Sequence, residues 1–231
     1  MFRNCKIVAL IPARGGSQAI KNKNMIKLNN RPMISYTITA AKNSKLIDEI
    51  YLSSDDKKIL RYATNQRINT IIRPKNISSN RSHSKDTVSH FIKKISKKVS
   101  KETIIVFLQP TSPLRNSKHI DDSIKKAVNS ARSLVSVCEV DSNVLKSIRI
   151  NTKNLVEPIF SENILTKRRQ DLEKIYKLNG AIYIFTVKQF LKKNNFPISN
   201  SHPFIMDSAS SLDIDSKSDL KFLRNLFNKK N

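Results

Sequence analysis

The twelve residues Lys6-Ile-Val-Ala-Leu-Ile-Pro-Ala-Arg-Gly-Gly-Ser17 decide the fold expected of this chain. The first part is a continuous apolar run, which is typical of a strand buried on both faces of a parallel sheet. The second part brings two of the chain's three glycines together directly after that strand. Ligands of open α/β sheets bind beyond the carboxyl ends of the strands, so we expect backbone N–H groups of this loop to approach an anion.

Outward from this stretch, apolar runs and helical patterns alternate along the chain. Asp86 is a candidate N-cap, and Ser216 with Asp219 forms a candidate capping box for the last helix. The order predicts an α/β protein with a mostly parallel sheet covered by helices. Strands are expected at residues 6–13, 49–53, 68–72, 103–108, 134–140 and 181–185, and helices at 32–42, 55–65, 86–99, 120–131, 187–193 and after 216.

The segment from Asp141 to Leu178 breaks this rhythm. It is polar, rich in Lys and Arg, and has no long periodic stretch. The length of 231 residues suits one domain, and no repeat or low-complexity linker divides it. We therefore predict a single domain over residues 1–231, with about 141–178 as a protruding arm.

The net charge of +25 raises the question of nucleic-acid binding. The lysines, however, are spread along the whole chain and fall on the polar faces of expected helices, and no helix-turn-helix, aromatic platform or zinc spacing accompanies them. No apolar run approaches the roughly 20 residues of a membrane span. We expect a cytoplasmic protein with no nucleic-acid or membrane partner and, with two cysteines, no disulfide framework.

Three further motifs carry polar side chains suited to a site. Leu108-Gln-Pro-Thr-Ser-Pro-Leu-Arg115 follows an expected strand, and its prolines stiffen a polar loop. Arg168-Arg-Gln-Asp-Leu172, followed by Asn179-Gly-Ala181, supplies paired arginines that suit carboxylates and phosphates. In Leu212-Asp-Ile-Asp215, an extended backbone would place both carboxylates on one side, an arrangement that suits Mg²⁺.

These four motifs, in this order and spacing, resemble the acylneuraminate cytidylyltransferases, also called cytidine-monophosphate sialic acid synthetases. The likeness runs from Lys6 to the C-terminus. It implies a Rossmann-like three-layer core and a homodimer in which each arm reaches into the other subunit. It also implies a reaction in which the anomeric hydroxyl of a nine-carbon 2-keto sugar acid, such as sialic, legionaminic or pseudaminic acid, attacks CTP and releases pyrophosphate.

The resemblance implies three groups of site residues. Those for the nucleotide are Ala13, Arg14, Gly15, Gly16, Ser17, Asn24, Arg73 and Ser84, the last two holding the cytidine. Those for the sugar acid are Gln109, Lys146, Arg169, Gln170 and Asn179, with Lys146 and Arg169 acting from the arm across the dimer interface. The implied catalytic residues are Arg14, Asp213 and Asp215, and the two aspartates hold Mg²⁺. Neither aspartate is assigned the role of base.

The chain departs from the family pattern in the second half of the glycine loop. Gln18 stands where a phosphate-facing lysine is usual, Ala19 replaces a glycine and Lys21 replaces a proline. Losing one charge-assisted phosphate contact costs on the order of 1.5–3 kcal/mol, so Lys21 and Lys23 are the candidates to replace it. Two alternatives stay open, namely a weakened or inactive paralogue that binds nucleotide, and a cytidylyltransferase for 3-deoxy-octulosonate.

Overall fold

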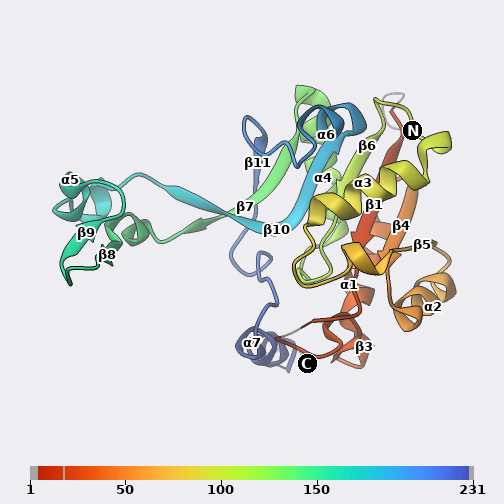
Figure 1. Ribbon diagram of the computed structural model, residues 1–231, viewed down its shortest axis with the longest axis horizontal. Coiled ribbons are helices and arrows are strands. Elements are labelled where there is room, and N and C mark those ends of the chain that lie inside the picture. The colour runs from red at the N-terminus through yellow and green to blue at the C-terminus, as the bar shows by residue number, and fades with distance from the viewer. Residues whose placement is uncertain (1–4, 18, 229–231) are drawn as a thin grey trace.

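The computed structural model describes residues 5–17 and 19–228. Its centre is a seven-stranded sheet in the order β11-β7-β10-β6-β1-β4-β5 (Figure 1). Only β10 runs antiparallel to its neighbours, and the other pairs are parallel, which confirms the expected mostly parallel sheet. The strands are β1 (Ile7–Pro12), β4 (Glu49–Ser54), β5 (Asn69–Ile72), β6 (Ile104–Phe107), β7 (Leu134–Val140), β10 (Ile175–Thr186) and β11 (His202–Ile205).

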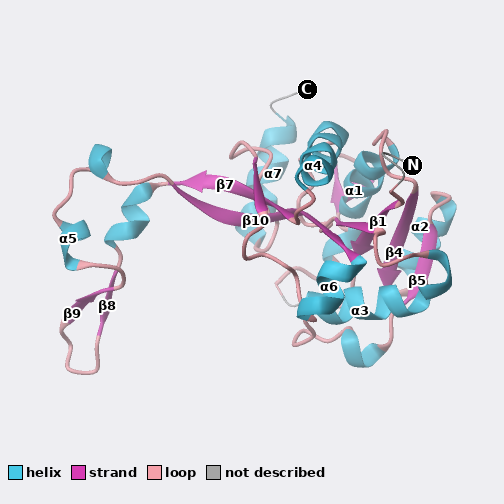
Figure 2. Cartoon of the chain, turned by 90° about the horizontal axis from the view of Figure 1, so that it is seen from above, coloured by secondary structure: helices cyan, strands magenta, loops and turns pink. Residues whose placement is uncertain are grey.

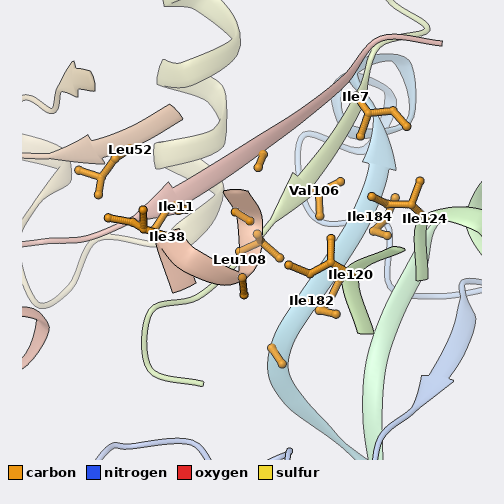
Figure 3. Packing of buried hydrophobic residues seen from close by; sticks show 14 of the residues in the cluster. Ile7, Ile11, Ile38, Leu52, Val106, Leu108, Ile120, Ile124, Ile182 and Ile184 are labelled. Atoms are coloured by element: carbon orange, nitrogen blue, oxygen red, sulfur yellow. The ribbon is translucent and has the colours of Figure 1, made fainter. Parts of the chain in front are cut away.

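Helices cover both faces of this sheet. The helices α1 (Met33–Lys42), α2 (Lys57–Asn65) and α4 (Ser117–Ser130) pack on the face that carries Ile7 and Ile11 of β1 (Figure 3). The helices α3 (Ser84–Lys94) and α6 (Val187–Lys193) pack on the opposite face, which carries Val8 and Leu10. Alternate residues of β1 thus bury against different layers, as expected for a strand that is apolar throughout.

The last helix, α7 (Lys217–Asn228), packs beside the first loop rather than on the sheet. Leu220 and Leu223 are buried against Ile20 and Leu28 of the segment that includes the short pair β2 (Lys27–Leu28) and β3 (Arg31–Pro32). The predicted capping box is confirmed, because the Asp219 carboxylate accepts from Ser216 N–H at 2.7 Å and the Ser216 hydroxyl accepts from Asp219 N–H at 3.2 Å. The sequence following the Asp213/Asp215 pair is therefore held next to the loop after β1.

The predicted arm extends well away from the sheet (Figures 1 and 2). Strands β7 and β10 continue out of the core as a two-stranded ribbon that ends in β8 (Ile148–Ile150), β9 (Val156–Pro158) and α5 (Glu162–Leu165). The register of β10 against β7 shifts between Leu178 and Tyr183, so a bulge separates the arm half of β10 from its core half. The arm leaves many large apolar side chains exposed: Ile148, Ile150, Leu155, Val156, Ile159, Phe160, Tyr176 and Leu178.

Several boundaries differ from the sequence-based expectations. Asp86 is not the N-cap of α3. His83 precedes the helix, and the Asp86 carboxylate accepts from the His83 N–H at 3.2 Å, as the third helical residue of a capping box does. The helix ends at Lys94, and Ser96–Lys98 forms a separate 3-10 turn. Strand β11 was not expected, because four residues that include a proline give no periodicity. Among the described helices, none is long and apolar enough to cross a membrane.

Candidate active site

A cavity of about 240 Å³ opens beyond the carboxyl ends of β1, β5 and β6. This is the edge where ligands of parallel α/β sheets bind. The cavity brings together segments that are far apart in the sequence, including the Asp213/Asp215 segment that precedes α7. The predicted site residues that line it are Arg14, Asn24, Arg73, Ser84, Gln109, Asp213 and Asp215.

Two arginines form the cationic wall of the cavity. Arg73 is almost fully buried and donates to the Ser53 carbonyl at 2.6 Å and to the Ser53 hydroxyl at 3.2 Å. Burial lowers the pKa of the Arg73 guanidinium to about 10, with Asp55 opposing the shift and the positive Arg14 adding to it. Arg14 donates to the Ser79 carbonyl at 3.0 Å. A guanidinium with the pKa of Arg73 is charged at neutral pH, and two arginines on one cavity suit an anionic ligand such as a nucleotide.

The glycine loop is held by contacts that the sequence did not reveal. The Gly15 N–H donates to the Asp55 carboxylate at 2.9 Å, so this amide does not point to an anion in the cavity. A Cβ on Gly15 would lie 2.8 Å from the Cβ of Asp56, which caps α2, so only glycine allows the two loops to approach this closely. Asn24 is buried and donates to the Arg14 carbonyl at 2.8 Å, which fixes the arginine's backbone.

The two predicted metal-binding carboxylates differ in environment. Asp213 is half-buried, and its Oδ1 is buried with no hydrogen-bond partner among the described residues. Burial raises the pKa of the Asp213 carboxyl. The hydrogen bond from Thr111 and the positive Lys23 act against this rise, and the neighbouring Asp215 adds to it. Asp215 is exposed and accepts from the Lys23 ammonium at 2.9 Å. An unpartnered buried carboxylate oxygen beside a second carboxylate fits a divalent cation.

No cluster of three or more His, Cys, Asp or Glu side chains that could hold a metal by itself occurs in the described part of the chain. Two carboxylates are nevertheless what Mg²⁺ usually takes from a protein when substrate phosphates and waters complete its coordination. The donor set of Asp213 and Asp215 therefore fits an ion that binds together with a phosphorylated substrate, and it does not fit a structural metal.

Gln109 and Thr111, from the loop after β6, also line the cavity. The Gln109 carbonyl accepts from Arg115 Nη1 at 3.1 Å, and the Thr111 carbonyl accepts from Ile214 N–H at 2.9 Å. The second bond joins the loop after β6 to the segment that carries both aspartates. The polar loop predicted after this strand therefore lines the cavity and is bonded to the aspartate segment.

The other predicted site residues do not line the cavity. Ala13 is fully buried in the core. Gly15, Gly16 and Ser17 lie beside the cavity, in the loop that precedes Lys23. Asn179 is buried, and its carboxamide bonds Ser136, Ser211 and the Ala181 N–H, so it is a structural residue of this chain. The residues that lie on the arm, away from the cavity, are Lys146, Arg169 and Gln170.

Sequence reasoning missed several residues that the structure brings to the cavity. One group lies in the turn after β5 and at the start of α3, and the others are Thr111 and the supporting Asp55. The turn after β5 contains no recognisable sequence motif. Its position after a parallel strand was the one indication that it lies at the ligand-binding edge of the sheet. The missed lining residues include Ser79, Ser82, His83, Thr87 and Thr111, whereas Lys23, one of the two lysines considered from the sequence, lines the cavity and Lys21 does not. Gln18, the main departure from the family pattern, lies outside the described residues.

Known proteins resemble this chain over nearly its whole length. The family model described as cytidylyltransferase matches residues 8–230. A pseudaminic acid cytidylyltransferase from Campylobacter jejuni strain 81-176 is 32% identical over 96% of both chains. A CMP-N,N'-diacetyllegionaminic acid synthase from Legionella pneumophila is 31% identical over 93% of both chains. An N-acylneuraminate cytidylyltransferase from Escherichia coli is 30% identical over 98% of this chain, which spans 53% of that longer protein.

Solved structures show the same fold at much lower identity. A CMP:2-keto-3-deoxy-manno-octonic acid synthetase complexed with CTP superposes with a TM-score of 0.72 at 16% identity, covering 98% of this chain and all of the other. A 4-diphosphocytidyl-2C-methyl-D-erythritol synthase gives a TM-score of 0.70 at 13% identity, covering 97% of this chain and 99% of the other. At these identities the likeness is one of fold alone.

Proposed function

The chain belongs to the cytidylyltransferase family, and we propose that it transfers CMP from CTP to the anomeric hydroxyl of a nine-carbon 2-keto sugar acid. The observation that carries the proposal is that one cavity is lined both by the arginines Arg14 and Arg73 and by the Asp213/Asp215 pair. The relatives that are about 30% identical act, by their names, on pseudaminic, neuraminic or legionaminic acids. The octulosonate enzyme resembles this chain in fold only.

The proposed chemistry is a substitution at the α-phosphorus of CTP. The hydroxyl oxygen of the sugar forms a bond to this phosphorus, the bond to the β-phosphate oxygen breaks, pyrophosphate leaves, and the hydroxyl proton is released. Such a reaction depends on positioning and on stabilisation of phosphate charge rather than on a covalent intermediate. We assign Arg14 and Lys23 to the phosphates, Arg73, Asn24 and Ser84 to the nucleoside end, and Gln109 to the sugar acid. All of these residues line the cavity.

The reaction is proposed to require Mg²⁺ held by Asp213 and Asp215. When bound, the ion would neutralise phosphate oxygens and lower the pKa of the attacking hydroxyl. Lys23 donates to both the Asp215 carboxylate and the Ile214 carbonyl, at 2.9 and 2.8 Å, so its ammonium lies at the cavity beside the segment that carries the carboxylates. That position allows it to supply the phosphate contact that a lysine at position 18 would have made.

We also propose that residues 1–231 act as one transferase unit in a homodimer whose arms exchange. Along the arm, Ile150 and Val156 are 69% and 63% exposed, in a two-stranded ribbon that buries few of its own apolar side chains. Such a surface needs a partner surface to be stable in water. Contact with a second copy would allow Lys146 and Arg169 to contact the sugar or phosphate charge in the other subunit.

The function is tested by incubating the protein with CTP, Mg²⁺ and a panel of N-acetylneuraminic, pseudaminic, N,N'-diacetyllegionaminic and 3-deoxy-octulosonic acids. Pyrophosphate release with a nine-carbon acid is expected. Release with the octulosonate alone would replace the proposed acceptor, and CTP binding without release from any acid would leave a nucleotide-binding protein. Asp213→Asn and Asp215→Asn should each abolish metal-dependent release, and survival of activity in both would refute the metal assignment.

Dimerisation is tested by sedimentation of the parent protein and of a variant with Ile150→Lys and Val156→Lys. The parent is expected to be a dimer and the variant a folded monomer with low activity. A matched control places lysine at Ile72, which is also exposed but lies on β5, and this variant should remain dimeric. A parent that sediments as a monomer would exclude the exchanged arms.

A further inference from the structure

Gly180 lies under the Gln109 side chain, in the bulge of β10. A Cβ placed on Gly180 would lie 2.9 Å from Gln109 Oε1 and 3.6 Å from Asp213 Oδ2. The first distance is shorter than side-chain atoms tolerate, so the Gln109 carboxamide occupies the space that any side chain at position 180 would take. The backbone of Gly180 has φ +73°, which also favours glycine. The lack of a Cβ at Gly180 and its positive φ are therefore both needed for the Gln109 carboxamide to take this position.

The Asn179 side chain holds the bulge of β10 that contains Gly180 through buried hydrogen bonds. Its carboxamide oxygen accepts from the Ser136 hydroxyl at 2.5 Å and from the Ala181 N–H at 3.2 Å. Its amide nitrogen donates to the Ser211 hydroxyl at 2.9 Å. All of these groups are buried. Because every polar group of the Asn179 side chain is engaged, the backbone at position 180 cannot move without breaking buried hydrogen bonds.

Arg115 sets the distance between the two segments that meet at the cavity wall. Its guanidinium is fully buried, and Nη1 donates both to the Gln109 carbonyl and to the Ala181 carbonyl, each at 3.1 Å. One atom thus joins the loop after β6 to the bulge of β10. The remaining nitrogens of Arg115, Nε and Nη2, have no partner among the described residues, so the side chain is not explained by an ion pair.

We propose that Gly180 and Arg115 are positioning residues for the sugar acid, because together they hold the Gln109 carboxamide beside Asp213. Gly180 leaves the space for the carboxamide, and Arg115 fixes the spacing of the backbones on either side of it. The inference rests on the proposed function, in which Gln109 contacts the acceptor and does not contact CTP.

The test is a double-mutant cycle between Gly180→Ala and Gln109→Ala. The acceptor is the acid of the panel that supports the fastest release of pyrophosphate from CTP. Gly180→Ala is expected to raise the KM for the acceptor about five- to tenfold, which corresponds to the loss of one hydrogen bond. The affinity for CTP, measured by calorimetry, should change less than twofold. In the Gln109→Ala background the same substitution should have no further effect on this KM. Arg115→Lys, which keeps the charge but loses the planar fork, should raise the same KM.

Additive effects in the cycle, or an unchanged acceptor KM for Gly180→Ala, would overturn the inference. Gly180→Asn provides the same Cβ on a residue that adopts positive φ more readily, and it replaces the alanine variant if that variant does not fold. If no acid supports turnover, the proposed function fails, and crystal structures of the parent and Gly180→Ala decide the inference separately. A Gln109 carboxamide in the same place in both would refute it, and a displaced carboxamide would support it.

Discussion

Replacing Lys23 with Met is expected to reduce kcat/KM about 10- to 100-fold while the free energy of unfolding changes little. The Lys23 ammonium donates to Asp215 Oδ1 at 2.9 Å and to the Ile214 carbonyl at 2.8 Å, and its side chain is 14% exposed at the cavity. With Gln18 in place of the usual lysine, Lys23 is the lysine that lines the cavity among the described residues, and we have proposed that it contacts the phosphates.

The two expected magnitudes follow from different environments of the same ammonium group. Coulomb attraction at 2.9 Å is about 1.4 kcal/mol at the dielectric constant of water and about 6 kcal/mol at an effective value of 20. Asp215 is 74% exposed, so solvent screening reduces the contribution of the pair to roughly 0.2–1 kcal/mol. A charge-assisted contact to a bound phosphate contributes about 1.5–3 kcal/mol, which is the larger effect.

The assay combines pyrophosphate release at varied CTP with urea denaturation of the same preparations. Lys21→Met is the matched control, because Lys21 is exposed two residues away and does not line the cavity. It should retain activity within about twofold, since surface substitutions away from the site have small effects. Equal losses in both variants, or a loss of activity that follows a loss of stability, would refute the reasoning.

Three further predictions follow from the packing. Gly15→Ala should lower the free energy of unfolding by about 1–3 kcal/mol because its Cβ would meet Asp56 at 2.8 Å, whereas Gly16→Ala, with open space around it, should cost less than about 1 kcal/mol, as measured by urea denaturation. Asn179→Ala should lower it by about 2–4 kcal/mol without changing CTP affinity by calorimetry. Burial, the largest cause, lowers the pKa of both His90 and His119, so the unfolded chain binds protons more readily. The two histidines contribute fully to the free energy of unfolding above the pKa of histidine in the unfolded chain, and this contribution is lost as the pH falls. On acidification, the melting temperature of a variant with both His90→Gln and His119→Gln should therefore fall less than that of the parent.

The alternating elements of the core could be predicted because their apolar periodicity is local. Strand β7 and helix α6 have the predicted bounds, and β1, β4, β5 and β6 differ by a residue or two at an end. Strand β10 begins at Ile175, six residues earlier than expected, because its arm half carries Tyr, Lys and Leu with no buried pattern. The antiparallel direction of β10 could not be predicted, since it depends on how the arm returns to the core.

The site could be predicted in part, because residues such as Arg14, Gln109 and Asp213 lie in motifs whose order is visible in the chain. The contacts that hold these residues in place could not be predicted from the sequence. Asp55 accepts from a glycine amide 40 residues earlier, and Lys23 meets Asp215 across 192 residues. Such contacts arise from the packing of distant segments, which composition and spacing do not encode. The same limit explains why Asn179 was predicted to bind substrate, although it braces a buried bulge.

The position of β10 also constrains how the polypeptide is made. In the sheet it lies between β6 and β7, both of which are synthesised earlier, and it is the last strand but one in the chain. Until residues 183–186 leave the ribosome, β6 and β7 each have an unpaired backbone edge in the middle of the future sheet. A nascent chain with two open central edges and a solvent-facing apolar ribbon is prone to pair with other chains. Expression of this protein should therefore depend on chaperones more than its final fold would indicate.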